Sequence, residues 1–324
     1  IAQRLELDGL PSEPLKLRGE WNPAAAWRLS RLVRRLSPDL VHAHTPHAHT
    51  LAALAVRLAG RPRRPLVVTR RVDFSIRRHA GFLKGWKYGR AADRIVAISE
   101  AIRRVLVSDG VAADRISVVP SGIDPARLAG ANPSGLRAEF GIPDSGLVVG
   151  TVAHFADHKD HATLAAAIPL VLAREPRAIF LLVGDGELKP DIERRVRALE
   201  VDRSVRFSGF RTDIPSILSF LDVLAVPSKE EGLCTTILDA LALGRPVAAT
   251  TAGGIPEIIE HGVQGLLSPP RDAEALAANI VSILADPARA RAMGEAGRAR
   301  VLERFSVDRM VEGNLEVYRQ VLGS

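Results

Sequence analysis

The sequence has little of several features that mark particular classes of protein. It contains one cysteine, Cys234, which excludes a disulfide framework and is consistent with a reducing cytosol. Aromatic residues make up 4% of the chain, so its cores must be built mainly from Ala, Val, Leu and Ile. No apolar run reaches the roughly 18 residues of a membrane span, and the opening residues do not resemble a signal peptide. No Asp-x-Asp triplet occurs, so a metal-bridged diphosphate is not indicated.

The features that are present favour two globular domains. A length of 324 residues suits two α/β domains, and a hydrophobic content of 47% can fill a core in each and argues against disorder. The charge is uneven, because residues 1–147 carry 24 Lys and Arg against 13 Asp and Glu, whereas the remainder carries 20 against 24. Either the basic half faces an anionic partner or surface, or an arginine-rich sequence simply scatters solvated charge.

Short apolar or β-branched runs alternate with longer segments of helical periodicity, which predicts parallel sheets with helices on both faces. The expected strands are 66–69, 93–98, 116–119, 147–152, 178–183, 222–226 and 246–250, and the expected helices include 162–174, 189–199 and 273–284. Turn and breaker residues gather at 125–145. We therefore expect two Rossmann-like doubly wound domains, 1–145 and 146–305, and a C-terminal helix in 306–324 that returns to the first domain.

The most informative segment is 227–260, PSKEEGLCTTILDALALGRPVAATTAGGIPEIIE, which predicts a glycine turn and then a helix from about Thr235 to Gly244. The first backbone N–H groups of this helix and its dipole form an anion site; they belong to Leu233, Cys234, Thr235 and Thr236. Glu231 and Asp239 would contact different parts of one elongated ligand. A glycine turn alone is common in α/β packing, but a second one at 253–254 makes coincidence a weaker explanation.

This segment resembles the signature of glycosyltransferase family 4 (glycosyl transferases group 1), which are retaining enzymes with the GT-B fold. The family's Glu-x7-Glu pattern appears as Glu231-x7-Asp239, with Pro-Ser before it, Gly-x-Pro-Val at 244–247 and Gly-Gly-x-x-Glu at 253–257. The resemblance implies that Glu231, beside the turn residue Gly232, contacts the donor hexose and that Asp239 contacts the nucleotide ribose. Asp239 is one methylene shorter than the glutamate of the family.

The resemblance runs from about residue 38 to the end. It places Lys159 on the lysine of the family's diphosphate clamp and His154 where the clamp has an arginine. A neutral histidine offers one hydrogen-bond donor, whereas the guanidinium of an arginine offers two parallel donors. The segment FSGFRTDIP resembles the loop that holds the base, with Phe210 and Arg211 as its contacts. His44 matches a histidine that reaches the donor sugar.

Two groups of residues in the first half have competing interpretations. His42 and His44 share a strand face, so a metal pair is a weaker alternative, while His47 and His49 fit ordinary surface or core positions. Several basic residues fit an acceptor-side patch or a solvated charged face; they are Arg70, Arg71, Arg77, Arg78, Lys84 and Lys87. The family usually opens with a strand and a glycine-rich loop, which nothing before Trp21 matches. We therefore expect that the chain starts near the second strand.

The resemblance implies a retaining hexosyltransferase that moves a sugar from a nucleotide diphosphate sugar to a glycan, lipid-linked or small-molecule acceptor, as in the synthesis of bacterial cell-envelope glycans. We expect no metal and no cofactor besides the substrate, no nucleic-acid partner, and a cytoplasmic location, with attachment to an anionic inner membrane face as an option. The alternatives are a non-catalytic nucleotide-sugar binding module, a GT-B epimerase or phosphorylase, and a nucleic-acid binder suggested only by the basic half. The turn VGDGE lacks the full dinucleotide fingerprint, so a dehydrogenase is rejected.

Overall fold

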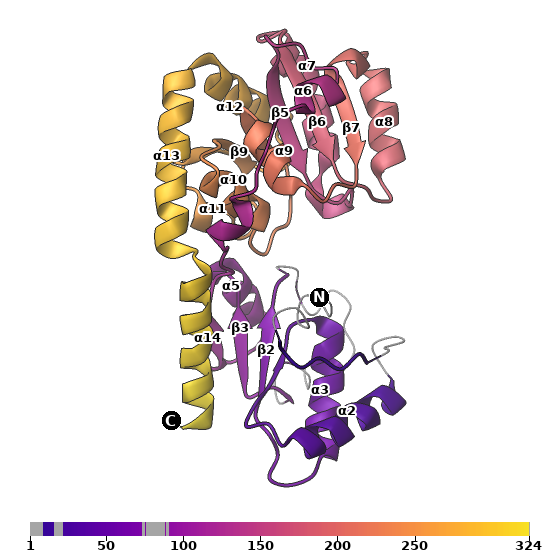
Figure 1. The fold of residues 1–324 in the computed structure, drawn as a ribbon, viewed down its shortest axis with the longest axis vertical. Coiled ribbons are helices and arrows are strands. Elements are labelled where there is room, and N and C mark those ends of the chain that lie inside the picture. The colour runs from indigo at the N-terminus through magenta and orange to yellow at the C-terminus, as the bar shows by residue number, and fades with distance from the viewer. Residues whose placement is uncertain (1–8, 16–21, 73–74, 76–87, 89–90, 324) are drawn as a thin grey trace.

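The structure, a computed structural model, describes residues 9–15, 22–72, 75, 88 and 91–323. Their helices and strands form two α/β domains, each built on a parallel sheet, and the two domains lie one above the other in Figure 1. The predicted α/β class with two parallel sheets is therefore confirmed. Among the described residues, no helix is both long enough and apolar enough to cross a membrane.

The sheet of the first domain has the order β1-β2-β3-β4, and helices cover both of its faces (Figure 1). Successive residues of a strand point to opposite faces, so Leu66 and Val68 join the core on one side while Val67 joins a cluster on the other. The elements are α2 (Pro23–Leu36), β1 (Val41–Ala43), α3 (Pro46–Leu58), β2 (Leu66–Arg70), β3 (Arg94–Ala97), α5 (Glu100–Ser108), β4 (Ile116–Val118) and the 3-10 helix η4 (Pro125–Leu128).

The second sheet has the order β10-β9-β8-β5-β6-β7, which is the Rossmann arrangement 3-2-1-4-5-6 read from the other edge. Its strands are β5 (Leu147–Val152), β6 (Ala178–Val183), β7 (Val205–Gly209), β8 (Val223–Val226), β9 (Val247–Thr250) and β10 (Gly265–Ser268). Its helices are α6 (Leu136–Glu139), α7 (His161–Leu172), α8 (Lys189–Ala198), α9 (Ile214–Phe220), α10 (Thr235–Ala242), α11 (Ile255–Ile258), α12 (Ala273–Ala285) and α13 (Pro287–Arg304). The strand order reverses between β5 and β8, where such folds bind ligands beyond the strand ends.

The last helix, α14 (Val307–Leu322), leaves the second domain and packs on the sheet of the first (Figure 1). A short parallel bridge guides it there, because the Ile123 N–H donates to the Phe305 carbonyl and the Val307 N–H donates to the Ile123 carbonyl, each at 2.9 Å. Val317 of α14 then completes an apolar cluster with valines of the first domain. The first sheet thus obtains the cover of one face from the end of the chain.

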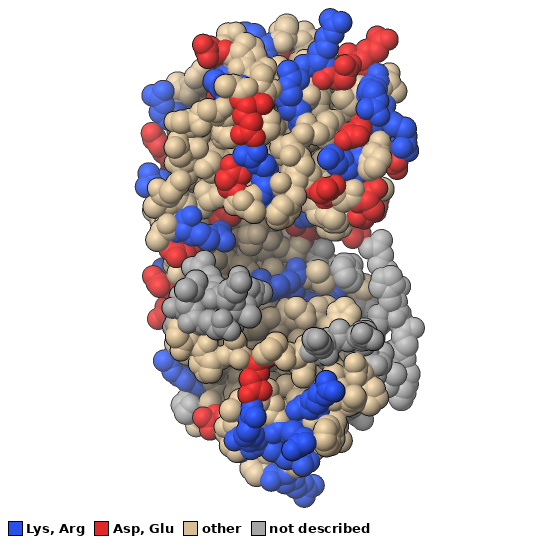
Figure 2. Space-filling view, turned by 45° about the vertical axis from the view of Figure 1, so that its right-hand side comes forward, with Lys and Arg blue, Asp and Glu red and all other residues tan. Residues whose placement is uncertain are grey.

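Close backbone contacts join the two domains next to their carboxyl strand ends. A Cβ on Gly232 would lie 2.1 Å from the carbonyl oxygen of Arg71 in the first domain. Within the second domain, a Cβ on Gly254 would lie 2.4 Å from the carbonyl oxygen of Gly232, so only glycine fits at either turn. The Glu257 carboxylate accepts the N–H groups of Glu100 and Ala101, both at 2.8 Å, at the N-terminus of α5. Figure 2 shows a recess between the domains with basic side chains on its floor.

Candidate active site at the domain interface

Helix α10 begins where the sequence predicted and presents its N-terminus at the strand ends. Cys234 occupies the N-cap position, and Gly244, with φ 70°, follows the C-cap at the other end. The side chains of Leu233 and Cys234 are buried, and burial raises the pKa of the Cys234 thiol to about 12, which keeps it protonated. These two residues therefore anchor the turn in the core, and what they can offer a ligand is their backbone N–H.

Glu231 and Lys159, which the sequence assigned to the hexose and to the diphosphate, are in direct contact. The Glu231 carboxylate, 7% exposed, forms an ion pair with Lys159 and accepts a hydrogen bond of 2.9 Å from the Ser228 hydroxyl. Lys159 follows β5 and Glu231 follows β8, so the pair sits at the reversal point of the sheet. One buried carboxylate is thus neutralised at the place where a diphosphate would bind.

The loops that carry this pair are also tied to each other. The Lys229 N–H donates to the His158 carbonyl at 2.9 Å, and the Lys229 ammonium lies 2.7 Å from a carboxylate oxygen of Asp157. Because both ties are local to the two loops, the spacing between Lys159 and Glu231 is fixed by backbone as well as by charge. This rigidity suits a site that must hold a charged group in one position.

A pocket of about 310 Å³ lies beyond the ends of β5 and β6. Its lining brings together three residues that the sequence predicted for nucleotide binding, namely His154, Phe210 and Arg211. The Phe210 side chain is 77% exposed, which is unusual for a phenylalanine and leaves a ring face available for stacking. His154 is also exposed, and its Nε2 lies 3.2 Å from Glu187 Oε2.

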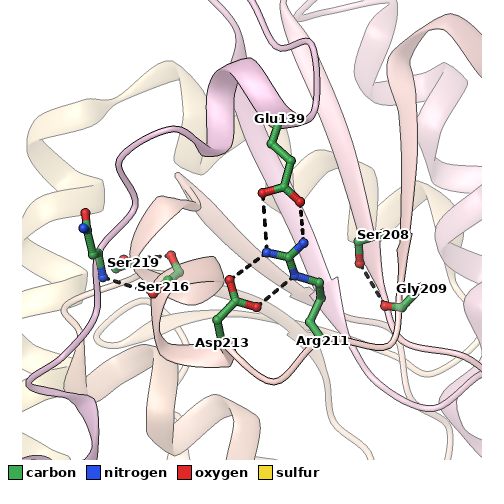
Figure 3. Close-up of polar contacts among 8 residues, drawn as sticks. Glu139, Ser208, Gly209, Arg211, Asp213, Ser216 and Ser219 are labelled. Atoms are coloured by element: carbon green, nitrogen blue, oxygen red, sulfur yellow. Dashed lines mark hydrogen bonds and ion pairs between the residues drawn. The ribbon is translucent and has the colours of Figure 1, made fainter.

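The Arg211 guanidinium is held by two carboxylates (Figure 3). Asp213 accepts from Nε at 2.8 Å and from Nη2 at 2.7 Å, and Glu139 of α6 forms an ion pair with Nη1. These bonds, first to Asp213 and then to Glu139, raise the pKa of Arg211 above its usual value. Since most of its donors are used, Arg211 fixes the shape of the loop, and contact with a base would fall to Phe210 and to the backbone.

Asp239, the predicted ribose contact, lies on α10 and forms an ion pair of 2.8 Å with Arg127 of η4. Burial raises the pKa of Asp239, while the charge and the hydrogen bond of Arg127 oppose that rise. A ribose bound here would share the carboxylate with Arg127. The arginine comes from the segment that connects the domains, 112 positions away in the chain, and no local pattern in the sequence indicates the contact.

The first domain contributes His44 and Arg71 to the same region. His44 is exposed just after β1, and its pKa is lowered by partial burial and by the charge of Arg71. The carbonyl of Arg71 in turn meets the Gly232 turn, so residues of both domains converge here. His47 and His49 were expected at ordinary surface or core positions, and the structure agrees, because His47 is exposed and His49 is buried.

The structure corrects the prediction that Arg70 belongs to an exposed basic patch. Its side chain is 5% exposed, its Nη1 donates to the Tyr88 hydroxyl at 2.8 Å, and its guanidinium lies over the Tyr88 ring. Alternation along β2 turns this side chain into the domain, whereas the exposed Arg71 follows the strand. The other members of the expected patch, Arg77, Arg78, Lys84 and Lys87, lie outside the described residues.

Comparisons with known proteins agree with this architecture. Family models described as Glycosyl transferases group 1 and Glycosyltransferase Family 4 match residues 146–286 and 4–127. The chain is 31% identical to a 2-deoxystreptamine glucosyltransferase of Streptomyces kanamyceticus, over 94% of this chain and 83% of that protein. It is 29% identical to a 2-deoxystreptamine N-acetyl-D-glucosaminyltransferase of Streptomyces fradiae, over 99% of this chain and 79% of that one.

Among solved structures, the Anabaena protein HepE in complex with UDP-glucose superposes with a TM-score of 0.85 at 25% identity, over 98% of this chain and 88% of that one. This similarity extends over both domains and over α14, and it identifies the arrangement of the two sheets as the GT-B fold. The two family models meet near the boundary between the sheets. The chain therefore belongs to glycosyltransferase family 4, the group 1 glycosyl transferases, and is a glycosyltransferase.

Proposed function

We propose that this enzyme moves a hexose from a nucleoside diphosphate sugar to an acceptor hydroxyl, with retention of the anomeric configuration and without a metal ion on the diphosphate. The observation that carries the proposal is the Lys159–Glu231 pair, which lies at the point where the sheet order reverses and next to the N-terminus of α10. A cation and a helix N-terminus together suit a leaving diphosphate, and a buried carboxylate suits sugar hydroxyls.

The proposed chemistry assigns each group a task. The bond between the anomeric carbon and the diphosphate oxygen breaks, and the diphosphate leaves with the electron pair, stabilised by Lys159 and by the first N–H groups of α10. When Lys159 turns toward the phosphate, the Glu231 carboxylate becomes available to hydroxyls of the hexose. The acceptor oxygen bonds to the anomeric carbon on the same face, and its proton passes to the departing phosphate. His44 would approach the sugar from the first domain.

A binding and product assay tests the proposal. The HepE complex makes UDP-glucose the first donor to try, and the two Streptomyces relatives make 2-deoxystreptamine the first acceptor. We expect calorimetry to detect UDP binding in excess chelator. When the UDP concentration is 100 times the dissociation constant, the free energy of unfolding should rise by about 2.7 kcal/mol. NMR of the product should show the anomeric configuration of the donor. Loss of binding in chelator would contradict metal independence, and an inverted product would contradict retention.

The same assay separates the alternatives. An epimerase changes the donor when no acceptor is present, and a phosphorylase requires inorganic phosphate. A non-catalytic module binds the donor and gives no product with any acceptor, whereas a nucleic-acid binder shows salt-sensitive affinity for generic DNA or RNA. We expect transfer that depends on the acceptor and none of these other patterns.

Changing Phe210 to alanine is expected to weaken the binding of free UDP by about fivefold or more, because stacking of one base on an aromatic ring is worth about 1–3 kcal/mol. The ring is 77% exposed beside the pocket, so little stability should be lost. Calorimetry measures the dissociation constant. Leu302→Ala, which removes an exposed apolar side chain from α13, is the matched control and should bind UDP as the wild type does. Equal affinities in the two variants would remove Phe210 from the base site.

A further inference from the structure

His42 of β1 is held from two sides by hydroxyl groups. Its Nδ1 lies 2.6 Å from the Tyr318 hydroxyl of α14, and its Nε2 lies 2.8 Å from the Thr69 hydroxyl of β2. A neutral imidazole has one nitrogen that donates and one that accepts, and a hydroxyl can meet either. Both nitrogens are therefore satisfied, and the ring cannot rotate without losing two hydrogen bonds.

The His42 ring in turn supports His44. The two ring centroids are 4.0 Å apart with 33° between the planes, and the Tyr318 ring meets His42 edge-on at 5.5 Å. Burial, His44 and Arg71 lower the pKa of His42 to about 3, so this residue stays neutral at physiological pH. His42 thus presents a fixed, uncharged face to the exposed ring of His44.

The contact also connects distant parts of the chain, since Tyr318 follows His42 by 276 positions. Tyr318 reaches His42 only because α14 crosses from the second domain to the sheet of the first, where Val317 packs with Val67 and Val96. The docking of this helix therefore brings the Tyr318 hydroxyl within hydrogen-bond distance of His42. The hydroxyl of Tyr318 adds a polar bond to an otherwise apolar contact, and packing alone does not require such a bond.

We propose that Tyr318, His42 and Thr69 are positioning residues that orient His44, and that the C-terminal helix is by this route part of the active site. The inference rests on the proposed function, which places His44 at the donor sugar. It predicts that loss of the Tyr318 hydroxyl affects turnover rather than donor binding, because His42 and His44 would sample other orientations while the second domain keeps its grip on the nucleotide.

The test compares two neighbouring variants on the same helix. Tyr318→Phe removes only the hydroxyl and should lower kcat about five- to tenfold, which corresponds to the loss of roughly one hydrogen bond, with an unchanged KM for the donor. Val317→Ala weakens the apolar docking of α14 and should lower the melting temperature while kcat stays at the wild-type value. On the other side of the His42 ring, Thr69→Val removes the second hydroxyl and should lower kcat as Tyr318→Phe does. Thr69→Ser keeps a hydroxyl and should retain the wild-type kcat.

Two further measurements decide whether the effect passes through His44. In a His44→Ala background, Tyr318→Phe should cause no additional loss of kcat. Independently of activity, NMR of the imidazole nitrogens should show altered shifts for both His42 and His44 in Tyr318→Phe and unaltered shifts in Val317→Ala.

Each contrary result has a distinct meaning. If His44→Ala lowers kcat while Tyr318→Phe keeps the wild-type kcat and imidazole shifts, the positioning role is overturned and the proposed function stands. If His44→Ala transfers sugar as well as the wild type does, the placement of His44 at the donor is wrong and the inference is overturned with it. Additive losses in the double variant would show that Tyr318 acts by a route other than His44.

Discussion

Replacing Lys159 by methionine is expected to lower the free energy of unfolding by about 3 kcal/mol, because the buried Glu231 carboxylate would lose the cation that neutralises it. Turnover should fall by about 10²–10³, as is typical when one preorganised donor is removed from a site that stabilises a leaving group. Denaturant unfolding measures the first quantity and steady-state transfer the second.

The double variant Lys159→Met with Glu231→Gln separates stability from function. It removes both charges, so most of the lost stability should return, while transfer should remain at the level of the single variant or below it. The matched control is Lys229→Met, which breaks the neighbouring ion pair with Asp157, whose side chain is 83% exposed. The Lys229 side chain is only 17% exposed, but the Asp157 carboxylate that is left behind stays solvated. Loss of this pair should therefore cost at most about 1 kcal/mol, and the control should stay near wild type in stability. A double variant as unstable as Lys159→Met would show that the pair is not the source of the loss.

Gly232→Ala is expected to reduce transfer by about 10²-fold while each domain keeps its fold. The added Cβ would lie 2.1 Å from the Arg71 carbonyl oxygen and 2.9 Å from its carbon. Both are backbone atoms, so no side-chain rotation relieves the clash, and we expect the backbone of one domain to shift away from the other. A displacement of about 1 Å between catalytic groups can cost that factor. Kinetics give the rate, and small-angle scattering gives the separation of the domains.

A second glycine supplies the control for this change. A Cβ on Gly130 meets nothing within 4 Å, so Gly130→Ala should leave both rate and shape at their wild-type values. Binding of free UDP offers a further distinction, since it is proposed to depend on the second domain alone and should persist in Gly232→Ala. Wild-type transfer in Gly232→Ala would mean that the contact between Gly232 and Arg71 is not part of the active arrangement.

The pattern of apolar and turn residues within a single segment was enough to predict several strands and one helix. The strands at 147–152 and 178–183 were predicted with the bounds that the structure shows, because each is an apolar run between turn residues. The start of α10 and the glycine after its end followed from the same kind of signal. The strand β7 was missed, since VRFSG is half-buried at a sheet edge and lacks a continuous apolar run.

The candidate site was predictable as a set of residue types but not as a set of contacts. Nothing near Asp239 in the sequence shows that Arg127 pairs with it, and nothing near Arg211 indicates Glu139. Glu257 was recognised only as part of a motif, whereas the structure places it on the N-terminus of α5, 156 and 157 positions away. Such contacts depend on how segments that are far apart in the chain come together, which the periodicity of a single segment does not encode.

The path of α14 has a consequence for the order in which the molecule is completed during synthesis. The ribosome makes the strands of the first sheet early, but the helix that covers Val67, Val96 and Val119 on one face is made only after the whole second domain. The second sheet, whose strands and helices all lie between residues 136 and 304, has its parts available sooner. Domains generally fold as units while the chain emerges. We therefore expect the domain that is translated first to be the one that finishes folding last.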